Sequence, residues 1–164
     1  MASPPADLTT LLGRLAASGA DFLLVGALAA VAQGAPLTTQ DVDVVHRRTP
    51  ENVDRLLAFL AEVDARYRGR PAGQILRPVR DALLGPGHNL FMTGLGPLDL
   101  LGAVEGGRGY EDLVASAIAI DVGGRPVRVL GLEALADLKR GATSAKDRLT
   151  LAILEDTLRR VRKS

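Results

Sequence analysis

Two aspartates stand two positions apart, Asp41 and Asp43, in the stretch Asp41–Val45, where acidic and aliphatic residues alternate as in a β-strand. Side chains two apart in a strand point to the same face, so we expect both carboxylates on one side. Two carboxylates this close repel each other unless a cation lies between them. Hard oxygen ligands suit Mg²⁺, which keeps some of its waters and is completed by substrate phosphates. The pair therefore predicts a magnesium site.

A third aspartate, Asp99, lies in an aliphatic stretch over Pro97–Leu101 that is also predicted to be a strand. An ionised carboxylate is costly to bury there unless it is paired or bound to a metal ion. If this strand lies beside Asp41–Val45, the three acids can hold two metal ions about 3.5–4 Å apart, the geometry for in-line phosphoryl or nucleotidyl displacement. A structural alternative stays open, because such aspartate pairs are common at strand starts and Asp41 alone can cap a turn.

Hydrophobic spacing predicts the elements that must position these acids. Helices are expected where apolar residues recur every three to four positions, and strands where short apolar runs lie between turn residues. The predicted helices are Asp7–Ala17, Ala27–Gln33, one that begins at Thr49-Pro50, Leu132–Arg140 and Ala145–Arg162. The predicted strands are Phe22–Val25, Asp41–Val45 and two hairpins, Asn89–Thr93 with Pro97–Leu101 and Ala117–Asp121 with Pro126–Leu130. The segment from Tyr67 to Pro86, rich in Arg, Pro and Gly, is predicted to be a loop.

This order of elements predicts an α+β fold with α/β character, in which helices flank a mixed β-sheet. The 164 residues fit a single domain over 1–164, and the net charge of +1 gives no overall attraction to nucleic acid or membrane. The sequence has no cysteine, which excludes disulfides and thiolate metal sites and fits a cytoplasmic protein. The apolar run Phe22–Ala32 is too short to span a bilayer, so we expect no membrane partner.

The residues around the acids resemble the nucleotidyltransferase superfamily that includes polymerase β, in the minimal bacterial form known from abortive-infection toxins. The family pattern is a strand ending in Gly-Gly or Gly-Ser, a helix, an Arg-x-Thr-x-Asp-hydrophobic-Asp strand, and later a hydrophobic-Asp-hydrophobic strand. The matching segments here are Gly26-Ala27 with the helix after it, Leu37 to Asp43, and Leu98-Asp99-Leu100. The closing helices match as well, with Lys139, Lys146 and Asp147 in the family's Lys…Lys-Asp positions. The resemblance spans about residues 20–158.

The resemblance implies an enzyme that transfers a nucleoside monophosphate from a nucleoside triphosphate such as ATP to a hydroxyl group of RNA, protein or a small molecule. It implies that Asp41, Asp43 and Asp99 are the catalytic residues and hold two Mg²⁺ ions. Within the family, the toxin of a toxin–antitoxin pair is the first expectation, with tRNA or a protein as acceptor and an antitoxin as a possible partner.

The resemblance also places the nucleotide. Gly26, at a helix start, would let backbone N–H groups approach the phosphates, and Lys139 would neutralise charge on the leaving pyrophosphate. Ala27 and Thr39 complete the nucleotide-binding set. Each has a structural alternative. Gly26 can allow a chain reversal, Thr39 can cap a turn, and Lys139 can interact favourably with the helix dipole at its helix end. Asp147 is expected to act as a capping-box residue with Ser144 rather than in the site.

Two residues depart from the family pattern. Ala27 stands where the family most often has a Gly or Ser that contacts the triphosphate, and Leu37 stands where it has Arg. Because all three acids are kept, the sequence supports metal binding more firmly than efficient nucleotide handling. Of the other candidates, Arg77 and Arg80 are expected to lie in a solvated loop rather than to clamp phosphates. His46 and His88 have no second histidine at ligand spacing, so neither is assigned to a metal.

Three functional hypotheses follow, led by the active nucleotidyltransferase. The alternative is a catalytically quiet relative that binds nucleotide or a partner protein, favoured by Leu37 and Ala27. A purely structural module is the third, and it does not explain three acids at strand positions on one expected face. Since the chain leaves little length for a separate substrate domain, we expect an open acceptor site or one completed by a partner chain.

Overall fold

The secondary structure follows the predicted order with several additions, in a computed structural model that describes residues 6–163. The α-helices are α1 (Leu8–Ala17), α2 (Gly26–Ala32), α3 (Pro50–Glu62), α4 (Arg80–Leu84), α5 (Tyr110–Leu113), α6 (Leu132–Lys139) and α7 (Ala145–Arg162). The strands are β1 (Phe22–Val25), β2 (Val42–His46), β3 (Arg66–Tyr67), β4 (His88–Thr93), β5 (Gly96–Leu101), β6 (Ala117–Val122) and β7 (Arg125–Leu130). Two 3₁₀ turns are η1 (Glu105–Gly107) and η2 (Val114–Ser116). The other residues of the predicted 1–164 domain lie outside the described part.

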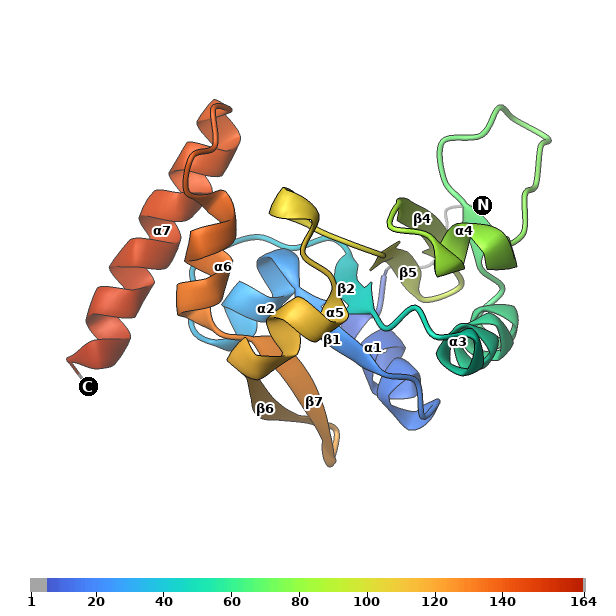
Figure 1. Ribbon diagram of the computed structural model, residues 1–164, viewed down its shortest axis with the longest axis horizontal. Coiled ribbons are helices and arrows are strands. Elements are labelled where there is room, and N and C mark those ends of the chain that lie inside the picture. The colour runs from blue at the N-terminus through green and yellow to red at the C-terminus, as the bar shows by residue number, and fades with distance from the viewer. Residues whose placement is uncertain (1–5, 164) are drawn as a thin grey trace.

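The strands of the described chain form one mixed sheet of seven, in the order β3-β4-β5-β2-β1-β7-β6. β2 runs antiparallel to β1 and parallel to β5, and β1 runs parallel to β7. The predicted hairpins are present as β4–β5 and β6–β7. In Figure 1, α6 and α7 lie at one end of the molecule and α3 and α4 at the other, with the sheet between them. The predicted α+β fold, a mixed sheet flanked by helices, is confirmed.

The core is mainly aliphatic, as a chain with 3% aromatic residues requires. Every residue of β1 is buried, and β2 is buried at every position except Asp43. Helix α3 begins at Thr49, whose hydroxyl accepts a hydrogen bond from the Asn52 N–H at 3.4 Å, with Pro50 in the first turn. Its apolar face is fully buried through Val53, Leu56 and Leu60. This packing fixes the central strands that carry the site.

The prediction that the chain from Tyr67 to Pro86 is a loop is wrong in part. Tyr67 ends β3 and Arg80–Leu84 forms α4. Helix α4 packs against α3, with Leu83 fully buried and the Arg80 side chain paired with Asp54 at 2.9 Å. A helix this short is stabilised by its packing rather than by its own sequence pattern, so the glycines and prolines around it hid it from the sequence analysis.

Besides one-residue shifts at other element ends, the start of β2 and the segment after β5 differ from the sequence analysis. Asp41 lies just before β2, which begins at Val42, and therefore sits in the turn that enters the strand. Between the hairpins, the segment that follows β5 folds into η1, α5 and η2, none of which was predicted. The buried side chain of Tyr110 anchors α5, so a long-range contact again decides a short helix.

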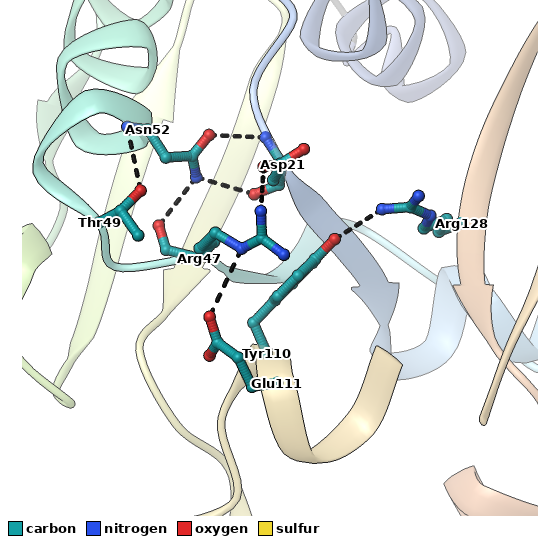
Figure 2. A network of polar contacts seen from close by, with 7 residues as sticks. All are labelled: Asp21, Arg47, Thr49, Asn52, Tyr110, Glu111 and Arg128. Atoms are coloured by element: carbon teal, nitrogen blue, oxygen red, sulfur yellow. Dashed lines mark hydrogen bonds and ion pairs between the residues drawn. The ribbon is translucent and has the colours of Figure 1, made fainter. Parts of the chain in front are cut away.

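A polar network closes the end of the sheet opposite the acids, where β1 begins and β2 ends (Figure 2). The Arg47 guanidinium donates to Asp21 at 2.7 Å, lies 3.4 Å from Glu111, and stacks over the Tyr110 ring at 4.7 Å from its centroid. The Asn52 side chain accepts from the Asp21 N–H at 2.6 Å and donates to the carbonyls of Asp21 and Arg47. The Tyr110 hydroxyl accepts from Arg128 at 2.7 Å. The network therefore ties β1 and β2 to α3, α5 and β7.

Among the helices of residues 6–163, none combines the length and the apolar character needed to cross a membrane.

Candidate active site

Sheet pairing brings together the three aspartates singled out in the sequence. Strands β2 and β5 are parallel neighbours, and in their register Asp43 lies directly beside Asp99. Asp41 joins them from the turn before β2. One carboxylate oxygen from each of the three lies within 4.8 Å of the others, which is close enough for shared metal ligands. Asp99 is 7% exposed, and Asp41 and Asp43 are half-buried.

The electrostatics of this cluster call for a cation. Burial raises the pKa of Asp43 to about 8, and its hydrogen bond with Asp99 and the charge of Asp41 act in the same direction. The pKa of Asp41 is also raised, first by burial and then by the charge of Asp99. In the metal-free cluster, the raised pKa of Asp43 favours its protonated form, which reduces the repulsion between the carboxylates. A divalent ion would displace this proton and neutralise the carboxylates.

The carboxylate of Asp99 fits a metal ligand for a second, independent reason. Its Oδ1 is buried and accepts no hydrogen bond from the described residues. Buried carboxylate oxygens are normally satisfied, since leaving one unpaired costs free energy. Among the described residues, the one ion pair of Asp99 is with Arg68 at 2.7 Å, so an oxygen-ligating cation such as Mg²⁺ could use the lone pairs that no hydrogen bond occupies. The residues present therefore fit the metal that the fold resemblance implies.

Arg68 is a site residue that the sequence analysis missed. Its Nη1 lies 2.7 Å from Asp99 Oδ1 and donates a hydrogen bond to the Phe91 carbonyl at 2.6 Å. Arg68 follows β3 directly, in the segment that was predicted to be a loop. No spacing in the sequence links it to Asp99, because the contact depends on β3 pairing with β4 and β4 with β5.

Gly26 stands where β1 turns into α2, opposite the acids. Its φ of +70° is in the left-handed region, which favours glycine. A Cβ at this position would overlap Asp43 Oδ2 and lie 3.0 Å from Asp43 Cβ. Glycine is therefore required twice, by the backbone conformation and by the close approach of the Asp43 side chain.

A cleft of about 670 Å³ opens beside the acids, between the end of the central strands and the α6–α7 pair. Asp41 and Asp43 line it, whereas Asp99 lies behind them and is not among its lining residues. Every other predicted nucleotide-binding residue also lines the cleft, namely Gly26, Ala27, Thr39 and Lys139. The Thr39 hydroxyl donates to the Asp41 carbonyl at 3.1 Å, which shapes the turn that presents Asp41. Leu37, the other departure from the family pattern, contributes to the apolar part of the lining.

The far wall of the cleft carries charged groups of both signs. Lys139 Nζ lies 3.6 Å from a Glu105 carboxylate oxygen and 3.4 Å from Asp147 Oδ1. The backbone N–H of Asp147 also donates the capping hydrogen bond to the Ser144 hydroxyl at 3.1 Å. Lys146 lines the cleft and its charge lowers the pKa of Asp41, an effect smaller than that of burial. Asp147 therefore takes part in both the cap and the cleft wall.

The remaining candidates lie away from the acids. Arg77 pairs with Asp64 at 2.7 Å and Arg80 pairs with Asp54, both as exposed ion pairs. His46 is fully buried, with Nε2 at 2.7 Å from the Leu83 carbonyl, and burial lowers its pKa. His88 Nε2 lies 2.9 Å from the Ala103 carbonyl. None of these four side chains lines the cleft.

No protein family model matches the sequence, and no curated protein matches it. Solved structures do match the fold. LnuA, a lincosamide antibiotic adenylyltransferase solved with lincomycin bound, superposes with a TM-score of 0.60 at 10% identity over 90% of this chain and 94% of LnuA. The antibiotic-resistance factor ANT(2'')-Ia gives 0.55 at 16% identity over 92% of this chain and 83% of that one. TM1012 of Thermotoga maritima, a proposed nucleotidyltransferase, gives a TM-score of 0.53 at 16% identity over 94% of this chain and 89% of TM1012. Together with the mixed sheet and its flanking helices, these likenesses establish that the chain has the nucleotidyltransferase fold.

Proposed function

We propose that this protein is a Mg²⁺-dependent nucleotidyltransferase that transfers a nucleoside monophosphate from a nucleoside triphosphate to a hydroxyl group. The observation that carries the proposal is the convergence of Asp41, Asp43 and Asp99 beside a cleft of about 670 Å³ that Asp41 and Asp43 line. A cleft of this size is in the range that binds small ligands and cofactors. The fold shared with nucleotidyltransferases supports the same conclusion.

Each residue at the cleft has a separate role in the proposed reaction. Bound Mg²⁺ would supply charge neutralisation at the phosphates and a lower pKa for the acceptor hydroxyl. Asp41 and Asp43 would hold the ions from the cleft wall, and Asp99 from behind them. The backbone at Gly26 and Ala27 would approach the phosphates, because no side chain at Gly26 intervenes. Thr39 would keep Asp41 in place through its hydrogen bond.

The proposed transfer is a single in-line displacement. The acceptor oxygen forms a bond to the α-phosphorus while the bond between that phosphorus and the pyrophosphate oxygen breaks, and the hydroxyl proton passes to solvent. Lys139, freed from one of its two carboxylate partners, would neutralise charge on the departing pyrophosphate. Positioning and charge stabilisation dominate such reactions, which suits a site made of carboxylates, one lysine and backbone N–H groups.

The acceptor is RNA such as tRNA, a protein, or a small molecule. The resemblance to abortive-infection toxins supports a toxin that is paired with an antitoxin in the cytoplasm. The structural likeness to LnuA, which was solved with lincomycin bound, supports testing small-molecule acceptors as well. The acceptor is proposed to enter from the open side of the cleft or at a surface completed by a partner chain.

A catalytically quiet module that binds nucleotide or a partner protein is the second candidate. Ala27 and Leu37, the two departures from the family pattern, both line the cleft. Neither side chain can hydrogen-bond to a phosphate, and Lys139 is already engaged by two carboxylates. This candidate therefore rests on the same cleft and differs only in the absence of turnover.

A transfer assay separates the two candidates. Purified protein is incubated with each α-labelled nucleoside triphosphate, MgCl₂ and one acceptor at a time: bulk tRNA, a protein extract or lincomycin. Asp41→Asn and Asp43→Asn are compared with Asp121→Asn, whose side chain is exposed on the distant edge strand β6. We expect both site variants to lose at least about a hundredfold in rate, since each removes a ligand of the ions that stabilise the transition state, and Asp121→Asn to keep the wild-type rate.

The outcomes are distinct. Label that enters an acceptor with wild-type protein and Asp121→Asn, but not with the site variants, supports the enzyme and identifies its acceptor class. Magnesium-dependent nucleotide binding without any transfer favours the quiet module. A folded protein that neither transfers nor binds nucleotide contradicts the enzyme and leaves only a quiet module that binds a partner protein.

A further inference from the structure

Arg68 is held beside the acid cluster by hydrogen bonds to the neighbouring strand β4. Its backbone N–H donates to the Leu90 carbonyl at 2.8 Å, and its Nη1 donates to the Phe91 carbonyl at 2.6 Å. The hydroxyl of the preceding residue, Tyr67, donates a hydrogen bond to the Asn89 side chain at 2.9 Å. These contacts all lead to β4, the neighbour of the strand that carries Asp99. The guanidinium is therefore positioned by the sheet and not only by its attraction to Asp99.

The contact between Arg68 and Asp99 is an ion pair without a hydrogen bond. Arg68 Nη1 lies 2.7 Å from Asp99 Oδ1, yet its hydrogen bond goes to the Phe91 carbonyl, and Oδ1 accepts none. The arginine thus supplies charge to Asp99 without saturating its lone pairs. An arginine side chain keeps its positive charge at any physiological pH, so deprotonation cannot remove this charge when a metal ion binds.

This fixed charge opposes metal binding at the same carboxylate. When all three aspartates are ionised, Arg68 offsets one of their three negative charges. A divalent ion near Asp99 is repelled by the guanidinium, and the repulsion is strong because the Asp99 carboxylate is buried. The negative charge of a bound triphosphate would offset this repulsion.

We propose that Arg68 is a built-in cation of the acid cluster, which holds Asp99 in place and weakens divalent-ion binding on the Asp99 side until a triphosphate enters the cleft. This inference rests on the proposed function. It makes Arg68 a positioning residue whose effect is on metal affinity, and it predicts that metal and nucleotide bind cooperatively.

The test is a titration with Mn²⁺ alone, followed by the electron paramagnetic resonance signal of the free ion, without nucleotide. Arg68→Met removes the charge, Arg68→Lys keeps it, and Arg77→Met removes a charge from an exposed ion pair outside the cleft. We expect Arg68→Met to bind Mn²⁺ about tenfold more tightly than the wild type, and the other two variants to match the wild type. A non-hydrolysable triphosphate analogue should then tighten Mn²⁺ binding more in the wild type than in Arg68→Met.

Tighter binding by a neutral variant is a result that a merely structural arginine would not give, because loss of a structural contact weakens a site. Circular dichroism and thermal unfolding in EDTA establish that each variant is folded, and Arg68→Gln replaces the methionine variant if that one is not. Equal or weaker Mn²⁺ binding by the folded neutral variant contradicts the proposed role of Arg68 and leaves the proposed function unaffected. A wild-type protein that binds no Mn²⁺ at millimolar concentrations, either alone or with the triphosphate analogue, overturns the metal site, and with it both proposals.

Discussion

The Asp43 carboxyl lies where three parts of the site meet: Asp99 beside it in the sheet, Gly26 facing it, and the cleft in front. Its position explains the raised pKa of about 8, since burial and neighbouring acids both disfavour the charged form. In the metal-free protein, Asp43 is therefore a group that holds its proton in the folded state and releases it in the unfolded state. Protonation and metal binding are alternatives at this residue.

The pH dependence of stability follows from this shift. Between the ordinary value of 3.8 and about 8, the folded state binds more protons at Asp43 than the unfolded state does. The contribution of Asp43 to the free energy of unfolding is therefore greatest at low pH and is lost as the pH rises through this window. We predict that the melting temperature of metal-free protein falls between about pH 5 and pH 8, and that Asp43→Asn falls less and melts higher at pH 8.

Thermal unfolding in EDTA across this pH range measures the effect, and Asp121→Asn serves as the exposed control. The stabilisation by Mg²⁺ should grow with pH in the wild type, since fewer protons compete with the ion. A steeper fall in Asp43→Asn than in the wild type would contradict the proposed protonation of Asp43.

At the scale of elements, the two ends of the β1–β2 pair carry different groups of residues. One end carries Gly26 and Asp43 at the cleft, and the other carries the network around Arg47 and Tyr110 (Figure 2). The network joins elements that are distant in the sequence, whereas it includes no residue that lines the cleft. The polar network and the proposed active site thus lie at opposite ends of the same pair of strands.

This separation predicts a stability effect without a catalytic one. Arg47→Met removes the ion pairs with Asp21 and Glu111 and the charged contact with the Tyr110 ring, and should lower the free energy of unfolding by about 1–2 kcal/mol. Urea unfolding measures the loss. Arg159→Met, which breaks only an exposed pair with Asp156 on α7, should change stability little. A transfer rate or Mn²⁺ affinity that drops along with stability in Arg47→Met would argue against this division.

The sequence predicted long elements and missed short ones, for a physical reason. Helix α3 and the two hairpins have caps, turn residues and apolar periodicity of their own, so local sequence is enough to place them. Helices α4 and α5 depend on the burial of Leu83 and Tyr110 under other elements. The same distinction applies to the site: the aspartates stand in recognisable strands, whereas Arg68 reaches Asp99 only through a chain of strand pairings.

At the scale of the whole molecule, the cleft lies between two unlike walls. One is formed by the central strands and α2, and the other by the α6–α7 pair at the end of the molecule in Figure 1. Helix α7 has only two buried residues over Ala145–Arg162 and packs mainly on α6. A ligand that bridges the walls should therefore stabilise the molecule beyond the site itself.

We predict that a nucleoside triphosphate with Mg²⁺ raises the melting temperature, by an amount equivalent to about 2.7 kcal/mol at a ligand concentration a hundred times the dissociation constant. Asp41→Asn should lose most of this stabilisation, and Asp121→Asn should keep it. Differential scanning fluorimetry with and without Mg²⁺ provides the measurement. Equal stabilisation of the wild type and Asp41→Asn would place the nucleotide elsewhere.

The parallel pairing of β2 with β5 also sets the order in which the site can arise during synthesis. Asp41 and Asp43 leave the ribosome early, but Asp99 reaches Asp43 only after the intervening α3, β3, α4 and β4 have been made. The wall that carries Lys139 and Asp147 emerges later still. A nascent chain therefore contains the first two acids without the third, so the proposed ion-dependent chemistry cannot begin until most of the polypeptide has been translated and has folded.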